Sequence, residues 1–379
     1  MNSVQRNKDV ISMQEDLEDL YRFDNFPVFM GCVDHPPEED LLFDMSWKIS
    51  KGSGAIQLDP LVPLEILYAE SHGSGNVGGM WLEHHQSFAK FIYQYKPVAV
   101  LEVGGAHGVL SREYRKSDHI DWTVVEPNPS PAKGVSATFI KGFFDNNFNF
   151  DGKVDTIVHS HVFEHVYHPN DFISNISNFL EESQKLIFSL PNMEKWLKEK
   201  YTNCLNFEHT VFLTEPYIDF LLSQHGFEQI DKEYFKDDHS IFYAYAKRAT
   251  PFAIELPEGL YEYNKGLFLN FIKHHQDLIE SLNRKIERVE GERSIYLFGA
   301  HIFAQYLVEF GLNVDRICCV LDNDENKQGK RLYGTNMMVE SPAILATVDS
   351  PIVILKAGFY NEEIMKGIGL INPATVFFN

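Results

Sequence analysis

The chain has 379 residues, more than one hydrophobic core usually supports, which predicts two or three domains. Its net charge of −21 argues against nucleic acid as a partner, because neutralising phosphates needs clustered Lys and Arg side chains. Acidic residues stand near the start, where a signal peptide would have an apolar run, and no stretch approaches the roughly eighteen apolar residues of a membrane span. We therefore expect a cytoplasmic protein that does not enter the membrane.

Residues 1–90 mix turns with short apolar runs and are predicted to form a small N-terminal domain. "MWLEHHQSF", near the end of this region, places His84 and His85 at the start of a helix that leads into the first strand of the next domain. We predict that one of them faces the substrate; a solvated helix face is the alternative. The four cysteines, Cys32, Cys204, Cys318 and Cys319, form no CxxC pair, so we expect no metal site and no disulfide framework.

Residues 91–250 alternate short β-branched runs with helical stretches. The runs are "VAVLEVGG", "DWTVVEP", "ATFIKGFF", "DTIVHSHVF", "KLIFSLPN", "FEQIDKEYF" and "SIFYAYAKR". Strands separated by crossovers of this length predict an α/β domain with a mostly parallel sheet and helices on both faces.

The first β-to-α turn of this domain is glycine-rich. Gly104, Gly105 and Gly108 permit tight backbone geometry there and allow main-chain N–H groups to approach a ligand. The second strand ends about twenty residues later at Glu126, where a carboxylate can accept hydrogen bonds from both hydroxyls of a ribose. Together these features indicate a cofactor that contains a nucleoside; a glycine-rich turn without a ligand is the alternative.

The spacing E-x-G-x-x-x-G, which begins at Glu102 on the strand, departs from the GxGxxG of dinucleotide-binding folds. It is similar to motif I of class I methyltransferases, and that resemblance implies S-adenosylmethionine as the cofactor. Asp145, after the third strand, is predicted to contact the adenine amino group; opening a turn is the alternative.

Histidines and an acid follow the fourth and fifth strands. Strand carboxyl ends border the ligand crevice of such folds, so His161 and His165 are candidates for facing the substrate. Glu208 and His209, in "NFEHT", fall on the same edge if the topology is regular. An imidazole there could act as a general base, although adjacent side chains in a strand point to opposite faces, so Glu208 need not orient His209.

A proline-bearing stretch and an amphipathic helix from about Tyr261 to Val289 make residues 251–290 a linker. The βα alternation restarts after Gly291 with "SIYLFGAHIFAQYL", "RICCVLDND" and "PIVILKAG". Residues 291–379 are therefore predicted to form a second, smaller α/β domain.

The whole chain resembles the three-domain sugar C-methyltransferases of deoxysugar biosynthesis. The similar segments are "VLEVGGAHGVL", "DTIVHSHVFEHV", "NFEHT" and, most particularly, the C-terminal "LDNDENKQGKRLYGT". The resemblance implies a small N-terminal domain that binds substrate, a class I (Rossmann-like) methyltransferase core and a C-terminal Rossmann-like domain. It also implies that His209 is the general base, that Glu208 holds a substrate hydroxyl or a charge, and that His165 is a further polar group of the active site.

The sequence departs from that family at three places. The N-terminal zinc-binding cysteines are absent, so Ser50 to Gly54 replace the metal knuckle and we expect a zinc-free version. Asn206, carried over as a substrate-binding residue, replaces a tyrosine whose phenol could stabilise an enolate. Phe303 replaces a lysine in the C-terminal glycine loop, which puts binding of a nucleotide diphosphate in doubt.

These observations predict an S-adenosylmethionine-dependent methyltransferase that acts on a sugar or nucleotide-linked sugar, at carbon or at oxygen. A methyltransferase for a non-sugar metabolite and a degenerate, non-catalytic binding module are the alternatives. A weaker third interpretation is an NAD-dependent sugar enzyme that uses "YLFGAHIF" as its cofactor loop. The oligomeric state does not follow from the sequence.

Overall fold

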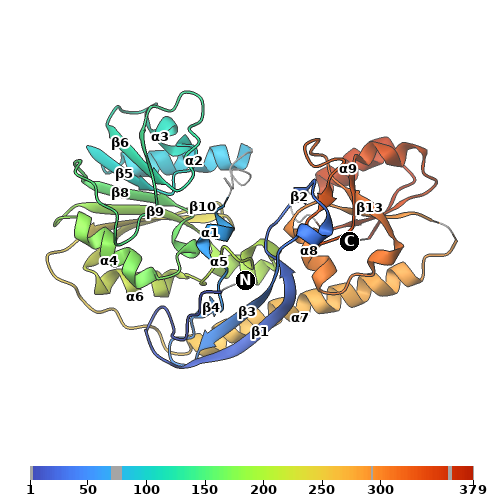
Figure 1. Ribbon diagram of the computed structural model, residues 1–379, viewed down its shortest axis with the longest axis horizontal. Coiled ribbons are helices and arrows are strands. Elements are labelled where there is room, and N and C mark those ends of the chain that lie inside the picture. Colours follow the sequence, from blue (N-terminus) through green and yellow to red (C-terminus); the bar gives the residue numbers. More distant parts are fainter. Residues whose placement is uncertain (1–2, 70–78, 292, 357–360, 379) are drawn as a thin grey trace. The chain divides into compact units, whose positions relative to one another are not determined.

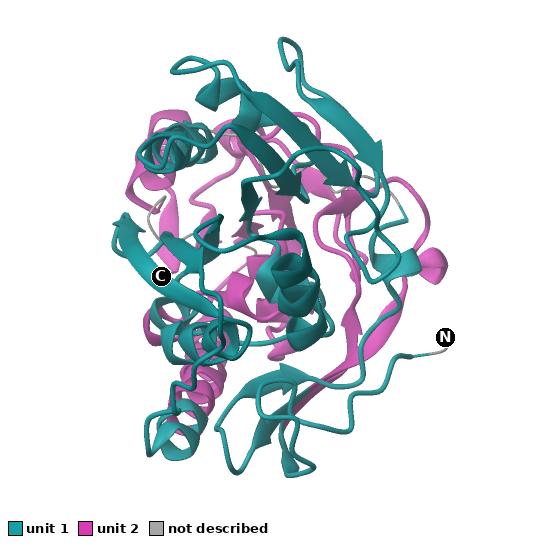
Figure 2. Ribbon diagram, turned by 90° about the vertical axis from the view of Figure 1, so that its left-hand side faces the viewer, with its two compact units in different colours: residues 1–20, 47–196, 207–265 teal, residues 21–46, 197–206, 266–379 magenta. Residues whose placement is uncertain are grey.

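The computed structural model describes residues 3–69, 79–291, 293–356 and 361–378. The chain forms two compact units, which Figure 2 shows in different colours. Unit 1 comprises residues 1–20, 47–196 and 207–265, and unit 2 comprises residues 21–46, 197–206 and 266–379. The three sequential domains expected from the sequence stay a prediction, because residues 1–90 are shared between the two units.

Unit 1 is built on a seven-stranded sheet with the order β10-β11-β9-β8-β5-β6-β7. Five neighbouring strands run parallel, and β11 is antiparallel to both β9 and β10. The strands are β5 (Ala99–Val103), β6 (Asp121–Glu126), β7 (Thr138–Lys141), β8 (Thr156–Ser160), β9 (Lys185–Pro191), β10 (Phe227–Phe235) and β11 (Ser240–Lys247). The expected mostly parallel sheet is confirmed. Its strand order reverses between β5 and β8, the place where sheets of this kind bind ligands.

Helices cover both faces of this sheet (Figure 1). Val100 and Val124 pack with Phe88 of α2 (Gly79–Tyr93) and Leu110 of α3 (Val109–Tyr114). The alternate strand residues, such as Leu101 and Ile157, pack with Ile173 of α4 (Pro169–Phe179) and Leu221 of α6 (Glu215–Gln224). Because strand side chains alternate between faces, an apolar run buried on both sides requires exactly such a double covering of helices.

The N-terminal region contributes a three-stranded sheet in the order β1-β3-β4. Its strands are β1 (Leu17–Pro27), β3 (Leu42–Ser50) and β4 (Ile56–Leu58), and the short α1 (Leu64–Leu67) follows. The turn at Ser50 to Gly54 is closed by hydrogen bonds: the Ser50 hydroxyl donates to Asp16 over 3.0 Å, and the Ser53 hydroxyl donates to Asp9 over 2.7 Å. Hydroxyl and carboxylate oxygens thus hold this turn.

Unit 2 contains a five-stranded parallel sheet in the order β15-β13-β12-β16-β17. The expected restart of βα alternation after Gly291 is thereby confirmed. Its strands are β12 (Ile295–Phe298), β13 (Ile317–Leu321), β15 (Val339–Glu340), β16 (Ile352–Leu355) and β17 (Val376–Phe378), and its helices are α8 (Ile302–Glu309) and α9 (Asn361–Ile371). The predicted long helix is α7 (Leu260–Glu287), whose Ile279, Leu282 and Ile286 pack in the unit 2 core.

The remaining helices come from both units. They are α5 (Met193–Glu199) and the 3-10 turns η1 (Pro37–Glu39), η2 (Phe163–His165), η3 (Thr202–Cys204), η4 (Val314–Arg316) and η5 (Pro342–Thr347).

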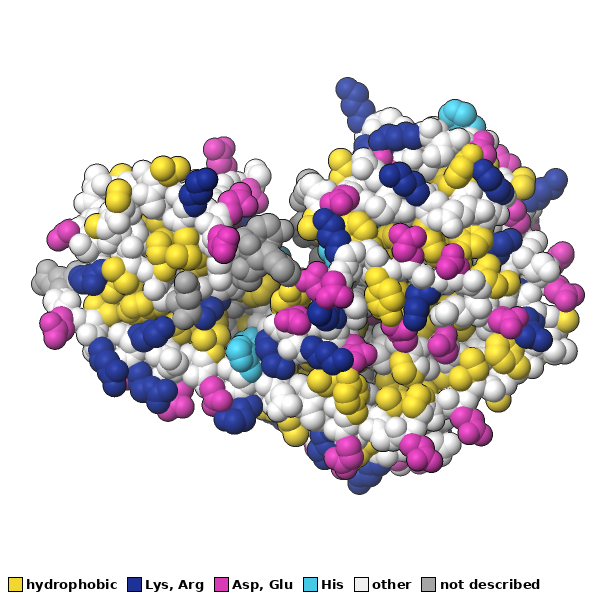
Figure 3. Space-filling view, turned by 180° about the vertical axis from the view of Figure 1, so that it is seen from behind, with side chains coloured by type: hydrophobic (Ala, Val, Ile, Leu, Met, Phe, Trp, Pro, Cys, Tyr) yellow, Lys and Arg dark blue, Asp and Glu magenta, His cyan; other side chains and the backbone are white. Residues whose placement is uncertain are grey.

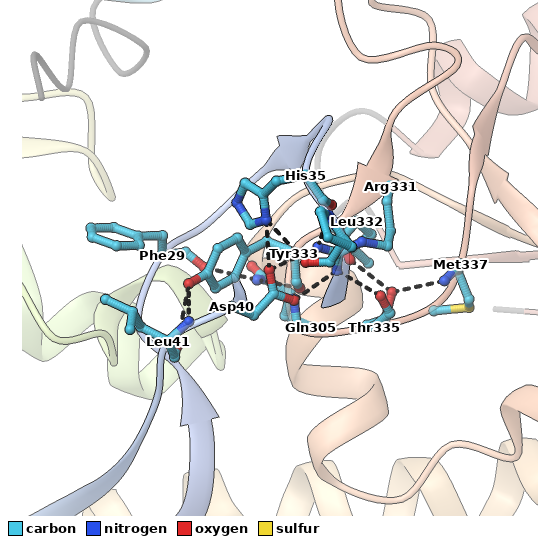
Figure 4. A network of polar contacts seen from close by, with 12 residues as sticks. Phe29, His35, Asp40, Leu41, Gln305, Arg331, Leu332, Tyr333, Thr335 and Met337 are labelled. Atoms are coloured by element: carbon cyan, nitrogen blue, oxygen red, sulfur yellow. Dashed lines mark hydrogen bonds and ion pairs between the residues drawn. The ribbon is translucent and has the colours of Figure 1, made fainter. Parts of the chain in front are cut away.

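An early segment of the chain is fastened into unit 2 by a buried ion pair (Figure 4). Both terminal nitrogens of Arg331 donate to the Asp40 carboxylate, over 2.7 and 2.8 Å. The two side chains are 8% and 3% exposed. Nearby, β2 (Cys32–Val33) pairs with β14 (Arg331–Leu332), and the Gln305 amide donates to the backbone oxygens of Phe29 and Tyr333. This bidentate pair and the contacts beside it therefore hold together residues that lie some 290 positions apart in the sequence.

Acidic and basic side chains are interspersed with apolar ones over the face that Figure 3 shows. Among the described residues, no helix combines the length and apolar character needed to cross a bilayer.

We predict that Arg331→Ala lowers the free energy of unfolding by about 3–5 kcal/mol, because it leaves the buried Asp40 carboxylate without its positively charged partner; the Gly334 N–H, which also donates to Asp40, carries no charge. Urea unfolding followed by circular dichroism measures the change. The exposed Arg316→Ala is the matched control and should stay within about 0.5 kcal/mol of the unsubstituted protein. Equal stabilities of the two variants would contradict the role given to the pair.

Candidate active site

The loop between β5 and α3 has a backbone that tolerates little besides glycine at its key positions. Gly104 and Gly108 both have φ of 69°, in the left-handed region. A Cβ atom on Gly104 would lie 2.6 Å from a methyl of Val162, and one on Gly105 would lie 2.7 Å from the Glu102 carboxyl carbon. The loop can therefore form its tight bend and keep its backbone close to the crevice only with these glycines.

Glu126, the last residue of β6, is held by the same loop. Its Oε2 accepts a hydrogen bond from the Ala106 N–H over 3.0 Å, and its Oε1 accepts one from the Asn128 N–H over 3.1 Å. These bonds fix the carboxylate at the carboxyl edge of the sheet. Each carboxylate oxygen has a further acceptor site for a ligand hydroxyl.

A cavity of about 640 Å³ opens at this edge, beside the point where the strand order reverses. Gly104, Glu126 and Asp145 line it, as expected for residues that hold a cofactor. Asp145 also accepts a hydrogen bond from the Asn147 N–H over 2.8 Å, so it opens a turn as well as lining the wall. Gly105 and Gly108 shape the loop and are not among the lining residues.

Glu102 does not line the cavity. It lies beneath the glycine loop, 3% exposed, and accepts a hydrogen bond of 2.6 Å from the Trp122 indole N–H. Burial raises the pKa of Glu102 to about 7, against the lowering effect of the Trp122 bond. The structure thus gives this acid a place as support for the loop.

His165, His209 and a third residue, Glu164, form a cluster at the same edge. One ring nitrogen of each histidine and one carboxylate oxygen of Glu164 all lie within 4.8 Å of one another. The His165 and His209 ring centroids are 5.3 Å apart, and His165 lines the cavity. Glu164 is fully buried, and neither carboxylate oxygen has a hydrogen-bond partner among the described residues. Burial raises the pKa of Glu164, and the two imidazoles oppose that shift.

Tyr68 adds a phenol to this cluster. Its hydroxyl lies 3.2 Å from Nδ1 of His165, and its backbone oxygen accepts a hydrogen bond of 2.8 Å from the Asn128 amide. Burial, and after it the charge of Glu208, raises the pKa of the Tyr68 hydroxyl, which keeps the phenol protonated. Glu208 is therefore close enough to act electrostatically on the cavity wall, although it is not a lining residue.

The structure places the remaining predicted residues in different surroundings. His161 lines the cavity at the end of β8. His84 is fully buried in α2 and His85 is 8% exposed there, so a solvated helix face is wrong for both; neither is a lining residue. Asn206 belongs to unit 2, where its buried amide donates to the Asn203 backbone oxygen over 3.1 Å.

Sequence reasoning missed Tyr68 and Glu164. Glu164 stands directly before His165 in "FEH". An acid next to a histidine is the signal in the sequence that could have identified it. Tyr68 follows α1, far from any motif, and nothing in its surroundings in the sequence marks it. Only the fold brings its hydroxyl to His165.

Residues 82–232 match the model of a family described as a methyltransferase domain. This stretch contains the parallel strands, the glycine loop and Glu126. It is similar to a methyltransferase domain. The expected class I fold and S-adenosylmethionine-dependent activity are confirmed at this level, and the Glu126 carboxylate, the glycine bend and the cavity volume fit the adenosyl part of that cofactor.

Solved structures similar to this chain are methyltransferases from several bacteria. One, from Clostridium acetobutylicum, is 13% identical, with 44% of this chain and 92% of that chain covered and a TM-score of 0.35. The N-methyltransferase NodS from Bradyrhizobium japonicum with S-adenosyl-L-homocysteine has 14% identity, coverage of 47% and 92%, and a TM-score of 0.37. Magnesium protoporphyrin IX methyltransferase from Synechocystis has 16% identity, coverage of 48% and 92%, and a TM-score of 0.36.

Likenesses this distant carry no argument about the substrate of this chain. No protein with a curated description matches it.

The raised pKa of Glu102 predicts a pH-dependent stability. Because the folded-state pKa lies above the ordinary 4.5, the protonated acid favours folding, and this contribution is present below about pH 4.5 and lost as pH rises through about 7. The difference between the folded-state pKa and the ordinary pKa corresponds to roughly 3 kcal/mol of the free energy of unfolding. We expect Glu102→Gln, which keeps an acceptor for Trp122, to be more stable than the unsubstituted protein at about pH 8 and similar to it near pH 4.5.

Urea unfolding at both pH values measures this difference, with the exposed Glu181→Gln as control. A stability difference between Glu102→Gln and the unsubstituted protein that is the same at both pH values would refute the burial argument.

Proposed function

We propose that the protein transfers the methyl group of S-adenosylmethionine to a sugar or nucleotide-linked sugar, with His209 as the general base. The observation that carries the proposal is the cluster of Glu164, His165 and His209 beside the cavity that Glu126 and Gly104 line. Resemblance to the three-domain sugar C-methyltransferases supports the choice of a sugar acceptor. The chain's own residues support a proton acceptor at this place.

The cofactor supplies a methyl group already activated on a sulfonium, so the protein has two tasks, to align the acceptor and to take up its proton. His209 lies against His165, whose ring meets the Tyr68 hydroxyl at Nδ1. A protonated phenol that donates to Nδ1 would fix the tautomer of His165 and leave its Nε2 side toward Glu164, 3.9 Å away.

The buried Glu164 carboxylate is the electrostatic counterpart of that proton. An imidazole that gains a proton becomes a cation, and a carboxylate within 4.8 Å in a water-poor site stabilises it. In the resting state, burial without hydrogen bonds disfavours the charge on Glu164. Proton uptake by His209 would relieve this cost, which makes the cluster better suited to the charged state that arises during methyl transfer.

The atom methylated follows from which proton His209 removes. Removal of a proton α to a ketone gives an enolate and carbon methylation, and removal of a hydroxyl proton gives oxygen methylation. Asn206 in place of a tyrosine takes away a phenol for the enolate and favours oxygen. In this proposal Glu208 holds a substrate hydroxyl, and His161 lies on the acceptor side of the cavity.

A degenerate binding module is the second candidate. It is favoured by the exchange of the family tyrosine for Asn206 and by the burial of His209, which is only 8% exposed. Such a module would bind S-adenosylhomocysteine and a nucleotide sugar without turnover.

We expect His209→Ala to keep its affinity for S-adenosylhomocysteine and to lose methyl transfer by between about a hundredfold and ten-thousandfold, the range for removal of a general base. Labelled S-adenosylmethionine and a panel of nucleotide-linked keto and hydroxy sugars provide the assay, with NMR to locate the label. The exposed His119→Ala is the control.

Turnover unchanged in His209→Ala would remove His209 as the base. Cofactor binding without transfer to any sugar by the unsubstituted protein would favour the binding module or a non-sugar acceptor.

A further inference from the structure

Three histidines that are distant in sequence converge in unit 1, next to the cavity. His84 comes from α2, His161 from the end of β8, and His239 from the turn between β10 and β11. One ring nitrogen of each lies within 4.8 Å of the other two. The ring centroids are separated by 5.3, 5.5 and 6.1 Å.

We propose that His84, His161 and His239 bind a divalent transition-metal ion of the zinc class. Imidazole nitrogen is a preferred ligand of Zn²⁺, and three protein ligands leave a fourth position for water or another oxygen. Zn–N bonds of about 2.0–2.1 Å in a tetrahedron require nitrogens roughly 3.4 Å apart. Small side-chain rotations would bring the present cluster to that spacing.

The groups around these rings resemble the outer shell of a metal site. Nδ1 of His161 lies 3.4 Å from Oε1 of the buried Glu164, and metal-bound histidines commonly give their other N–H to a carboxylate. Nε2 of His161 would then bind the ion in place of its present contact with the Ser240 hydroxyl, which lies 2.9 Å from it and 2.6 Å from Nδ1 of His239. The Glu164 carboxylate, which has no hydrogen-bond partner among the described residues, would receive one from the Nδ1–H of His161.

Packing alone does not account for the cluster. The Trp81 ring contacts all three imidazoles, with centroid distances of 4.9–5.3 Å, and an apolar ring could fill the same space. His84 is fully buried, however, and its Nδ1 has no hydrogen-bond partner among the described residues, which costs free energy that a phenylalanine would avoid. His161 also has φ of 53°, a left-handed conformation that a residue other than glycine adopts at a cost. Metal binding would offset both costs.

An ion at this place would join three segments of unit 1 and fix the cavity wall that His161 forms. It is distinct from the cysteine knuckle of the related sugar enzymes, which this chain lacks. Cysteine spacing could not reveal it, because its ligands are 77 and 78 residues apart in the sequence. The identity of the acceptor does not enter the argument for this site, which shares Glu164 with the cluster that contains His209.

The test is a titration of the chelator-treated full-length protein with Zn²⁺, and with Co²⁺ followed by its visible absorption. We expect one equivalent of ion, a raised melting temperature with Zn²⁺, and a cobalt spectrum of a low-coordinate nitrogen site. His239→Ala, at a turn where the fold should survive, and His84→Ala should each weaken Zn²⁺ binding by more than the roughly 10- to 100-fold expected for the loss of an outer-shell partner. Glu164→Gln should fall within that range, and His119→Ala should bind as the unsubstituted protein does.

Circular dichroism of each metal-free variant tests whether it is folded. If His84→Ala does not fold, His239→Ala alone decides the outcome. Zinc binding that His239→Ala leaves unchanged would overturn the site. Binding that is lost in His209→Ala but kept in His239→Ala would place the ion at Glu164, His165 and His209 instead, and would equally overturn it. Failure of the unsubstituted protein to bind either ion would do the same.

Discussion

The hydrogen bond from the Ala106 N–H to the Glu126 carboxylate is the contact on which the candidate site depends. It joins the loop after β5 to the end of β6, so the backbone bend and the acid are held as one unit at the carboxyl edge of the sheet. The bend exists because Gly104 and Gly108 adopt left-handed conformations beside Val162 and Val135, where a Cβ atom has no room. A methyl donor with a ribose and no pyrophosphate suits an acid and a tight loop placed in this way.

Several buried titratable groups lie near this edge. Four of them are almost completely buried: Glu102, Glu164, His84 and His159. Burial raises the pKa of the two acids and lowers the pKa of the two histidines, so it favours the neutral form of each. Their cost has to be offset by apolar packing elsewhere, as in the layers that contain Leu101 and Ile157. Buried titratable groups with shifted pKa values are common at functional sites. Here Glu164 belongs to the proton-accepting cluster and also lies beside His161 of the three-histidine cluster.

The sequence predicted the parallel strands and the glycine turn of unit 1 well, because these features are local. Strand, glycine turn, helix and the acid about twenty residues later form one short βαβ unit, so spacing alone determines where Glu126 lies relative to Gly104. The acceptor side is assembled from distant segments, and there prediction was weaker. Tyr68 and Glu164 were missed, His84 was placed at the substrate but lies in the core, and Glu102 was assigned to the cofactor but supports the loop from below. The sharing of residues 1–90 between two compact units depends on long-range pairs such as Asp40 with Arg331, which no local pattern encodes.

The central claim is that the crevice between Gly104 and Glu126 holds the nucleoside of the methyl donor. Calorimetric titration of S-adenosylhomocysteine into the unsubstituted protein and Glu126→Ala tests it most directly, with Glu181→Ala as a control far from the crevice. The account predicts a single site whose affinity falls between about 10- and 150-fold in Glu126→Ala, as for the loss of hydrogen bonds to a charged group, and is unchanged in the control. Equal affinities of Glu126→Ala and the unsubstituted protein would contradict the account.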